Sequence, residues 1–207
     1  RVPAVLEAWF SGSEVGNALA DVVFGAVNPS GKLPFTFPVR LEDNGAHALG
    51  EYPGADKVKY NESIFVGYRW HDKEQLKPLF AFGHGLSYTA FAVGNVKADR
   101  TTLAPNGSIR ISADVTNTGD RAGAEVVQLY IGDEQSSLPR PVKELKGFQK
   151  VSLNPGQTRT VTFEITPGML QYYDDAKGAW VAEPGAFTAY VGAASDDIRG
   201  TVEFELK

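Results

Sequence analysis

The chain has 207 residues, of which 43% are hydrophobic and 22% are charged, and its formal net charge at pH 7 is −5. This composition, with 22 glycines and 12 prolines, is typical of a folded, turn-rich protein and argues against disorder. Acidic and basic residues are interspersed, so the chain lacks the basic surface expected of a protein that binds nucleic acid or an anionic membrane. The absence of cysteine excludes disulfides, thiolate catalysis and cysteine-based zinc sites. We expect a neutral or polar small-molecule partner and no cofactor.

The amino-terminal segment is typical of one layer of an α/β domain. Residues 3–10 are apolar except for Glu7 and do not alternate, which predicts a strand covered on both faces in a parallel sheet. Ser11 and Glu14 have the spacing of a capping box, so we expect a helix to begin here and to end at Gly25. A lone strand and helix cannot bury themselves, which predicts that the rest of this domain lies outside the sequence.

Residues 28–37 follow as an edge element, because their flanking prolines cannot donate hydrogen bonds to a sheet. We therefore assign residues 1–40 to the carboxyl-terminal edge of an incomplete α/β domain. Residues 41–90 form a long connector, rich in aromatic residues, with one short strand predicted at 63–70. A connection this long inside a compact protein is usually functional or packed between domains.

From residue 91 the pattern changes to short strands separated by turns. Ile109, Ile111, Ala113 and Val115 alternate with polar residues, which predicts a strand with one buried face. Eight such strands are expected, at about 93–99, 108–117, 123–132, 142–150, 158–165, 178–182, 186–193 and 198–206. Residues 91–207 therefore predict an immunoglobulin-like β-sandwich, and the missing cysteine pair favours its fibronectin type III-like form.

The three histidines, His47, His71 and His84, are not spaced like metal ligands, and we assign them to hydrogen bonding at the surface or between domains. Tyr172 and Tyr173 are interpreted as a corner of the sandwich, with a tyrosine hydroxyl bonded to nearby backbone. Neither group predicts a catalytic centre.

Glycoside hydrolysis requires two carboxyl groups placed across a sugar ring, and the candidate carboxylates here have ordinary explanations. Glu7 lies in the predicted buried strand, where either a raised pKa or an ion pair to another domain would fit. The remaining candidates lie in turn-like polar surroundings, where a solvated carboxylate is the simpler interpretation: Asp72, Asp174, Asp175, Asp196 and Asp197. We assign no catalytic residue and no metal ligand.

The loop after the first predicted strand is the best candidate for contact with a ligand. Ligands of α/β sheets bind at the carboxyl ends of the strands, and Trp9 lies at that end. Its ring could stack on a sugar, whereas packing between domains is the alternative. Ser11 and Ser13 could donate hydroxyl groups, and Glu14 closes the same loop. These four residues are the predicted substrate-proximal positions.

Several motifs together resemble the carboxyl-terminal portion of family 3 glycoside hydrolases, the β-glucosidase group. The motifs are Ala8-Trp-Phe-Ser-Gly-Ser-Glu14, Asn17-Ala-Leu-Ala-Asp-Val-Val-Phe-Gly25, Asn28-Pro-Ser-Gly-Lys-Leu-Pro34, Ile64-Phe-Val-Gly-Tyr-Arg-Trp70, Phe82-Gly-His-Gly-Leu-Ser-Tyr-Thr89, Val115-Thr-Asn-Thr-Gly119, Glu125-Val-Val-Gln-Leu-Tyr130 and Pro141-Val-Lys-Glu-Leu-Lys-Gly-Phe148. The resemblance covers nearly the whole chain.

The resemblance implies part of a retaining enzyme that removes terminal non-reducing β-D-glucosyl residues, with a β-glucoside or oligosaccharide as substrate. It also implies that a barrel domain supplies an aspartate nucleophile and that a preceding loop supplies a glutamate acid/base, so both catalytic carboxyl groups would lie outside this chain. The expected partner is the remaining amino-terminal part of the same enzyme, and a secreted or periplasmic location is favoured over a cytoplasmic one. The alternative is an autonomous β-sandwich that binds carbohydrate or mediates adhesion without catalysis.

Overall fold

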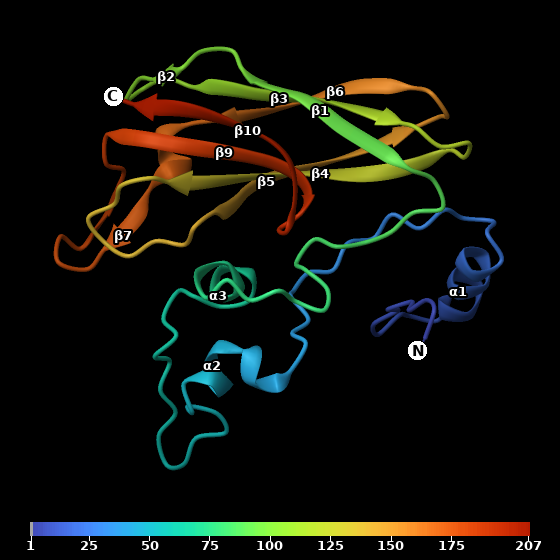
Figure 1. Cartoon of the computed structure of the whole chain (residues 1–207), viewed down its shortest axis with the longest axis horizontal. Coiled ribbons are helices and arrows are strands. Elements are labelled where there is room, and N and C mark those ends of the chain that lie inside the picture. The colour runs from blue at the N-terminus through green and yellow to red at the C-terminus, as the bar shows by residue number, and fades with distance from the viewer. Residues whose placement is uncertain (1) are drawn as a thin grey trace.

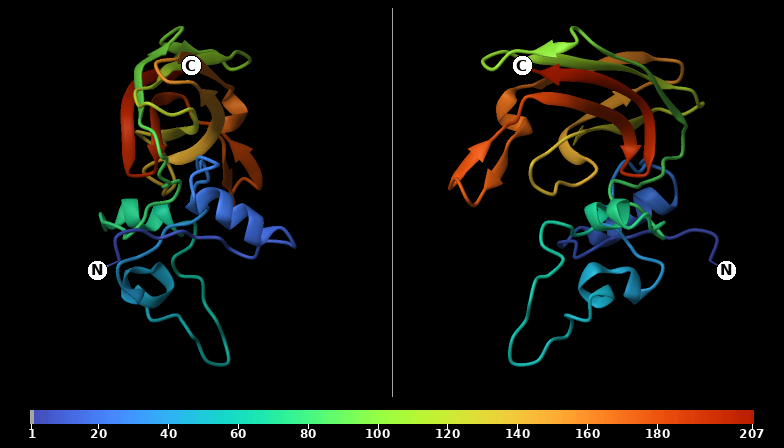
Figure 2. Two further views of the ribbon diagram at one scale, coloured as in Figure 1. Left: turned by 90° about the vertical axis from the view of Figure 1, so that its right-hand side faces the viewer. Right: turned by 60° about the vertical axis from the view of Figure 1, so that its left-hand side comes forward.

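The computed structural model describes residues 2–207 and consists of a β-sandwich with a mostly irregular amino-terminal region packed along one side of it. In Figure 1 the sandwich forms the upper layer, and the helices α1 (Val15–Val23), α2 (Gly45–Ala48) and α3 (Tyr68–Lys73) lie beneath it. The two turned views in Figure 2 place these helices on the same side of the sandwich. None of the helices between residues 2 and 207 has the length and hydropathy needed to span a bilayer.

Two sheets form the sandwich, as the alternating pattern predicts. The smaller sheet has the order β1-β3-β6, and the larger has the order β2-β10-β9-β4-β5. Their bounds are β1 Phe91–Ala98, β2 Thr102–Leu103, β3 Ile109–Asn117, β4 Gly123–Asp133, β5 Glu144–Leu153, β6 Thr158–Ile165, β9 Gly185–Ala194 and β10 Asp197–Leu206, with a separate hairpin of β7 Tyr172–Asp174 and β8 Ala179–Val181. The prediction of a fibronectin-like sandwich is confirmed, and its eight expected strands are present. Strands β2 and β7 were not predicted, because strands of two or three residues are too short to show an alternation of apolar and polar side chains.

The core lies between the two sheets and consists of the inward-facing positions of each strand. On β3, Ile109, Ile111 and Val115 are completely buried, and antiparallel pairing places Ile111 opposite Phe163 of β6. Each buried aliphatic side chain of this size contributes about 1.5–3 kcal/mol to folding. The sandwich therefore has the apolar core needed to hold its shape without disulfides.

Strand β4 differs from the other strands because both of its faces are covered. Residues 127–131 are buried without interruption, although β4 lies in a sheet whose outer face would ordinarily meet water. The outer face is covered by the connector, where the Tyr68 ring lies edge-on to that of Tyr130 at 5.7 Å and stacks on Phe82 at 5.0 Å. The prediction that the connector packs through its aromatic residues is confirmed.

The predicted strand at residues 3–10 is not formed. The segment is irregular, and the side chains of Val5, Leu6 and Phe10 are exposed. A strand buried on both faces needs neighbouring strands for its hydrogen bonds, and no segment between residues 2 and 207 pairs with this one. That this apolar segment is covered by a part of the enzyme outside the sequence stays a prediction.

Helix α1 begins one turn later than the capping-box interpretation predicts. The Ser11 hydroxyl donates to the Ala8 carbonyl at 2.9 Å, and Glu14 accepts a hydrogen bond from the Asn17 side chain at 2.6 Å, so the capping box is not formed. The end of the helix is confirmed, because Gly25 has φ +78°, a left-handed conformation that glycine adopts without strain.

The strand predicted at residues 63–70 is not formed: residues 63–67 are turn and irregular structure, and residues 68–70 begin helix α3. Gly67 has φ +58° and ψ −129°, which turns the chain out of an extended path and into the helix. Within the helix, consecutive residues Trp70 and His71 are both buried, whereas a strand would send them to opposite faces. The edge element at 28–37 does pair, through a bridge between Phe37 and Phe80.

Candidate functional site

The loop predicted to approach a ligand is held in a strained conformation by its own polar groups. Trp9 has φ +50°, which is uncommon for a residue other than glycine, and its backbone N–H donates to the Glu7 carboxylate at 3.1 Å. The Trp9 side chain remains 49% exposed. The structure brings Trp9, Ser11, Ser13 and Glu14 into one exposed loop, and their contact with substrate stays a prediction.

Glu7, predicted to be buried, is exposed together with the rest of its segment. Its carboxylate is occupied by the Trp9 backbone rather than by an ion pair to another domain. The correction follows from the missing strand at 3–10, because without neighbouring strands nothing encloses this side chain.

A row of aromatic rings connects Trp9 with the connector. Trp9 meets Phe35 edge-on at 5.2 Å, Phe35 meets Phe37 at 4.9 Å, Phe37 meets Phe80 at 6.3 Å, and Phe80 stacks on His84 at 5.5 Å. Aromatic pairs in these arrangements contribute about 0.5–1.5 kcal/mol each beyond the burial of their area. This aromatic row links the Trp9 loop to the end of the connector at Phe80 and His84.

Apolar side chains of the Trp9 loop and of the segments next to it in the sequence, here called the apolar face, are open to solvent in this chain. Phe10 is fully exposed and Phe24 is 87% exposed, and α1 has no buried residue at all. The exposed apolar side chains of this face are Val2, Val5, Leu6, Trp9, Phe10, Val23, Phe24, Val27 and Phe35. Exposed apolar side chains that gather into a patch mark a protein interface in a folded protein.

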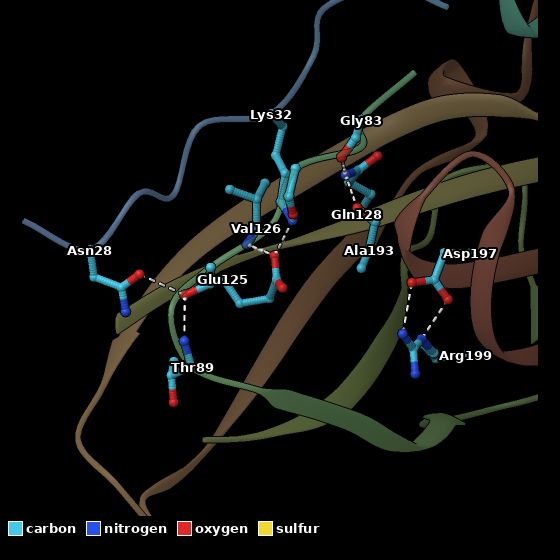
Figure 3. Close-up of polar contacts among 12 residues, drawn as sticks. Asn28, Lys32, Gly83, Thr89, Glu125, Val126, Gln128, Ala193, Asp197 and Arg199 are labelled. Atoms are coloured by element: carbon cyan, nitrogen blue, oxygen red, sulfur yellow. Dashed lines mark hydrogen bonds and ion pairs between the residues drawn. The ribbon is translucent and has the colours of Figure 1, made fainter. Parts of the chain in front are cut away.

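The 28–37 segment is fastened to the sandwich by a polar joint (Figure 3). Lys32 pairs with Glu125 of β4 at 2.7 Å, with both side chains largely buried, and its Nζ also donates to the Gly85 carbonyl at 2.9 Å. The Asn28 side chain donates to the Ala122 carbonyl at 2.9 Å. These contacts hold the edge of the amino-terminal region against β4.

Gln128 forms the centre of this polar joint. Its side-chain amide donates to the carbonyls of Gly83 at 3.1 Å and Ala193 at 2.6 Å (Figure 3), and its oxygen accepts from the Tyr130 hydroxyl at 2.5 Å. The residue is 3% exposed, so each polar atom is satisfied by the protein rather than by water. One side chain therefore joins the connector, β4 and β9.

A second set of contacts fastens α3 to the start of β5. Lys143 pairs with Asp72 at 2.6 Å, Arg69 pairs with Glu144 at 3.2 Å, and the Tyr68 hydroxyl accepts from the Leu145 N–H at 2.9 Å. Burial raises the pKa of Asp72, and its hydrogen bond to Lys143 opposes that rise. Burial also raises the pKa of Glu144, but the guanidinium of Arg140 and the nearby cations outweigh burial. The net result is that the pKa of Glu144 is lowered from its ordinary value.

The lowered pKa of Glu144 predicts how this contact responds to acid. A carboxylate with a depressed folded-state pKa stabilises the protein above the unfolded pKa, and the contribution disappears as the pH falls through the folded pKa. We expect Glu144→Gln to destabilise the chain at pH 7, and we expect this effect to shrink as the pH falls from the ordinary glutamate pKa of about 4.3 through the lower pKa of the folded state. Urea unfolding of both proteins between pH 7 and pH 3 measures this, and an equal loss at every pH would contradict it.

Two of the other carboxylates considered as catalytic candidates, Asp174 and Asp197, form ion pairs with neighbouring cations. Asp174 pairs with Lys177 at 2.8 Å, and Asp197 pairs with Arg199 at 2.6 Å. The ammonium of Lys177 lowers the pKa of Asp174, the opposite of what a general acid requires. These ion pairs explain both residues without a role in catalysis.

His71 is buried and forms a ring hydrogen bond, as predicted, whereas His47 and His84 lie against aromatic rings. His47 lies against Tyr52 with ring centres 4.7 Å apart, whereas the His71 Nδ1 lies 3.0 Å from the Gly67 carbonyl. The corner interpretation of Tyr172 is wrong, because its buried hydroxyl finds no hydrogen-bond partner within residues 2–207. The ring instead packs under the Arg140 guanidinium at 5.4 Å.

Comparison with known proteins places both parts of the chain. Residues 1–88 match the glycosyl hydrolase family 3 C-terminal domain, and residues 125–195 match the fibronectin type III-like domain. The chain is 53% identical to Beta-glucosidase BoGH3A of Bacteroides ovatus, over 99% of its own length and 28% of that protein. It is 48% identical to Thermostable beta-glucosidase B of Acetivibrio thermocellus, over 96% of its length and 26% of that protein.

Solved structures of beta-glucosidases also resemble this chain over nearly its whole length. The GH3 beta-glucosidase of Bifidobacterium adolescentis superimposes with a TM-score of 0.89 at 38% identity, covering 97% of this chain and 29% of that one. The Kluyveromyces marxianus beta-glucosidase in complex with glucose gives a TM-score of 0.85 at 43% identity, covering 95% of this chain and 23% of that one. The chain thus spans about a quarter of the length of the relatives it matches.

The two matched regions define a glycoside hydrolase module, in which a carboxyl-terminal domain edge is fastened to a fibronectin type III-like sandwich through the polar joint. The chain belongs to glycosyl hydrolase family 3 and corresponds to the carboxyl-terminal part of its β-glucosidases.

Proposed function

We propose that this chain acts as the carboxyl-terminal part of a retaining, exo-acting β-glucosidase that removes terminal non-reducing β-D-glucosyl residues. The β-glucosidases that resemble it along nearly its whole length support the reaction. In this proposal the catalytic carboxyl groups belong to the remaining amino-terminal part of the enzyme. The chain alone is then inactive, and it contributes a scaffold and one wall of the site.

The observation that carries the proposal is the exposed apolar face around the Trp9 loop. A monomeric protein rarely leaves such a surface in water, and Phe10 and Phe24 are among its most exposed side chains. The partner that fits is the rest of the α/β domain, because residues 3–10 have the composition of a buried strand that lacks its neighbours. Docking there would place Trp9 at an enclosed interface next to the substrate.

We expect Trp9→Ala in the complete enzyme to lower kcat/KM for an aryl β-glucoside at least about tenfold, a loss of about 1.4 kcal/mol of transition-state stabilisation. The physical reason is the lost aromatic face, together with a strained loop no longer held against Phe35. Steady-state kinetics measures this, with Trp180→Ala on the distant β8 as the matched control. An unchanged kcat/KM in Trp9→Ala would show that this loop does not contribute to the active site.

The alternative, an autonomous sandwich, makes a different prediction that gel filtration can test. If the chain forms part of a larger enzyme, it associates with the amino-terminal part when the two are produced together. A monomeric chain that binds polysaccharide without associating would favour the autonomous module.

A further inference from the structure

The turn between β2 and β3 contains an Asn-Gly pair that the proposed function does not use. The turn spans residues 104–107, and the Gly107 N–H closes it by donating to the Ala104 carbonyl at 2.9 Å. Strand β2 lies along the upper edge of the sandwich, on the side opposite the helices α1, α2 and α3 (Figure 1). The turn therefore lies away from the apolar face, and its chemistry is independent of the proposed hydrolysis.

An asparagine that precedes a glycine can lose its side-chain amide without an enzyme. The backbone nitrogen of the glycine attacks the asparagine Cγ and forms a new N–C bond. The Cγ–NH2 bond then breaks, and ammonia leaves with the proton that the backbone nitrogen gave up to solvent. Water opens the resulting succinimide ring at either carbonyl, which gives aspartate or isoaspartate. Glycine allows this attack best, because it has no Cβ and its backbone turns most freely.

The sequence has eight asparagines, and only Asn44 and Asn106 precede a glycine. Asn154 precedes a proline, whose backbone nitrogen carries no proton to lose. The other five donate hydrogen bonds through their side-chain amides: Asn17, Asn28, Asn61, Asn95 and Asn117. The choice therefore lies between Asn44 and Asn106.

Asn44 is held in place by the structure around it. Its side-chain oxygen accepts a hydrogen bond from the Ala46 N–H at 3.2 Å, at the start of α2. The following residue, Gly45, is buried, and a Cβ there would lie 3.0 Å from the Trp70 ring. Ring closure would require the carboxamide to leave Ala46 and the packed backbone to turn. We therefore expect folding to protect Asn44.

Asn106 is free of both restraints. Its side chain is exposed and makes no hydrogen bond within residues 2–207. The Gly107 N–H must leave the Ala104 carbonyl before its nitrogen can attack, but this bond belongs to a turn at the surface. Opening one such hydrogen bond slows a reaction about tenfold at most. Folding therefore leaves Asn106 reactive.

We propose that Asn106 is a modification site of the folded chain, which deamidates spontaneously to a mixture of aspartate and isoaspartate. Either product adds a negative charge to a chain whose net charge is already −5. Isoaspartate also routes the backbone through the side-chain carbon, which lengthens the turn. The ends of the turn are fixed, because Leu103 before it and Ile109 after it are completely buried in the core. The isoaspartate form therefore strains this edge of the sandwich.

The test is incubation of the full 207-residue chain in mildly alkaline water enriched in oxygen-18, followed by peptide mass spectrometry. Each deamidation during the incubation incorporates oxygen-18, whereas deamidation during the later digestion in ordinary water does not. In the folded chain we expect Asn106 to convert at least about tenfold faster than Asn44. In guanidinium chloride, where the protection of Asn44 is lost, we expect the two rates to become similar.

Gly107→Ala is the matched variant. Gly107 does not have a left-handed φ, and a Cβ there would lie 3.4 Å from the Ala104 Cβ, so alanine fits the turn. Its methyl group hinders the attack on Asn106, and we expect the rate to fall at least about tenfold. Gly94→Ala, where a Cβ would meet nothing within 4 Å, is the control and should convert at the parent rate. Circular dichroism confirms that both variants are folded.

Absence of oxygen-18 at position 106 in the folded chain would overturn the proposal. An unchanged rate in Gly107→Ala would also overturn it, because the succinimide route would then be wrong. Faster conversion of Asn44 than of Asn106 in the folded chain would contradict the assignment of the site. An equal ratio of the two rates in folded and unfolded chains would show that the fold does not select Asn106, which contradicts the structural argument.

Discussion

Gly83→Ala is expected to destabilise the chain by about 3 kcal/mol, because the added methyl group meets a buried side chain that cannot move aside. Gly83 has φ +81°, and a Cβ there would lie 2.6 Å from the Gln128 Nε2, which is far inside contact distance. Rotating Gln128 away would break its hydrogen bonds to Gly83 and Ala193 and its bond from Tyr130. For a chain of this size the loss corresponds to a fall in Tm of about 6–12 °C.

The matched control for Gly83→Ala is Gly156→Ala. Gly156 has φ +72°, nearly the same backbone conformation, but a Cβ there would meet nothing within 4 Å. The control therefore measures backbone strain alone, for which we expect about 1 kcal/mol. Urea unfolding followed by tryptophan fluorescence measures both variants. An equal loss of unfolding free energy in the two variants would contradict this prediction, because it would show that Gln128 can move aside at little cost.

Arg140→Met is expected to cost about 3–5 kcal/mol, since it removes the cation from a buried cluster of charges. Arg140 pairs with Asp133 at 2.9 Å and with Glu144 at 2.8 Å, and it also donates to the Leu170 carbonyl at 2.9 Å. Burial already raises the pKa of Asp133, and Arg140 opposes that rise. Without Arg140 the carboxylate would remain buried and unpaired.

Two comparisons separate the buried cluster from a general effect of losing an arginine. Arg159→Met on the exposed face of β6 should change stability by less than about 0.5 kcal/mol. Asp133→Asn combined with Arg140→Met should recover part of the loss, because the unpaired buried charge is then absent. A loss below 1 kcal/mol for Arg140→Met alone would contradict the importance of this cluster.

The sandwich could be predicted from sequence because its strands carry their own pattern. Alternation at Ile109, Ile111 and Val115 depends only on which face meets the core, so it can be read without knowing the partner strand. Residues 3–10 carried an equally clear apolar pattern, but a strand forms only when neighbouring strands supply its hydrogen bonds. The apolar pattern of residues 3–10 therefore did not predict the structure that the segment adopts in this chain.

The contacts of the polar joint could not be predicted from the sequence, because they connect residues that are far apart in the chain. Lys32 and Gln128 belong to motifs that carried the family resemblance, yet nothing in their spacing shows that they contact Glu125 and Gly83. The signal that could have found them is polarity at expected core positions. Glu125 and Gln128 interrupt the apolar run of β4, and a polar residue there needs a partner.

Replacing the matching segment of the Bacteroides ovatus relative with this chain tests the central claim most directly. The account predicts that the chimera hydrolyses an aryl β-glucoside, whereas neither the isolated chain nor the relative without this segment does so. Converting Phe10 and Phe24 to Asp on the exposed apolar face should then abolish hydrolysis by preventing docking. Full activity of the relative without the segment, or of the chimera after those substitutions, would contradict the account.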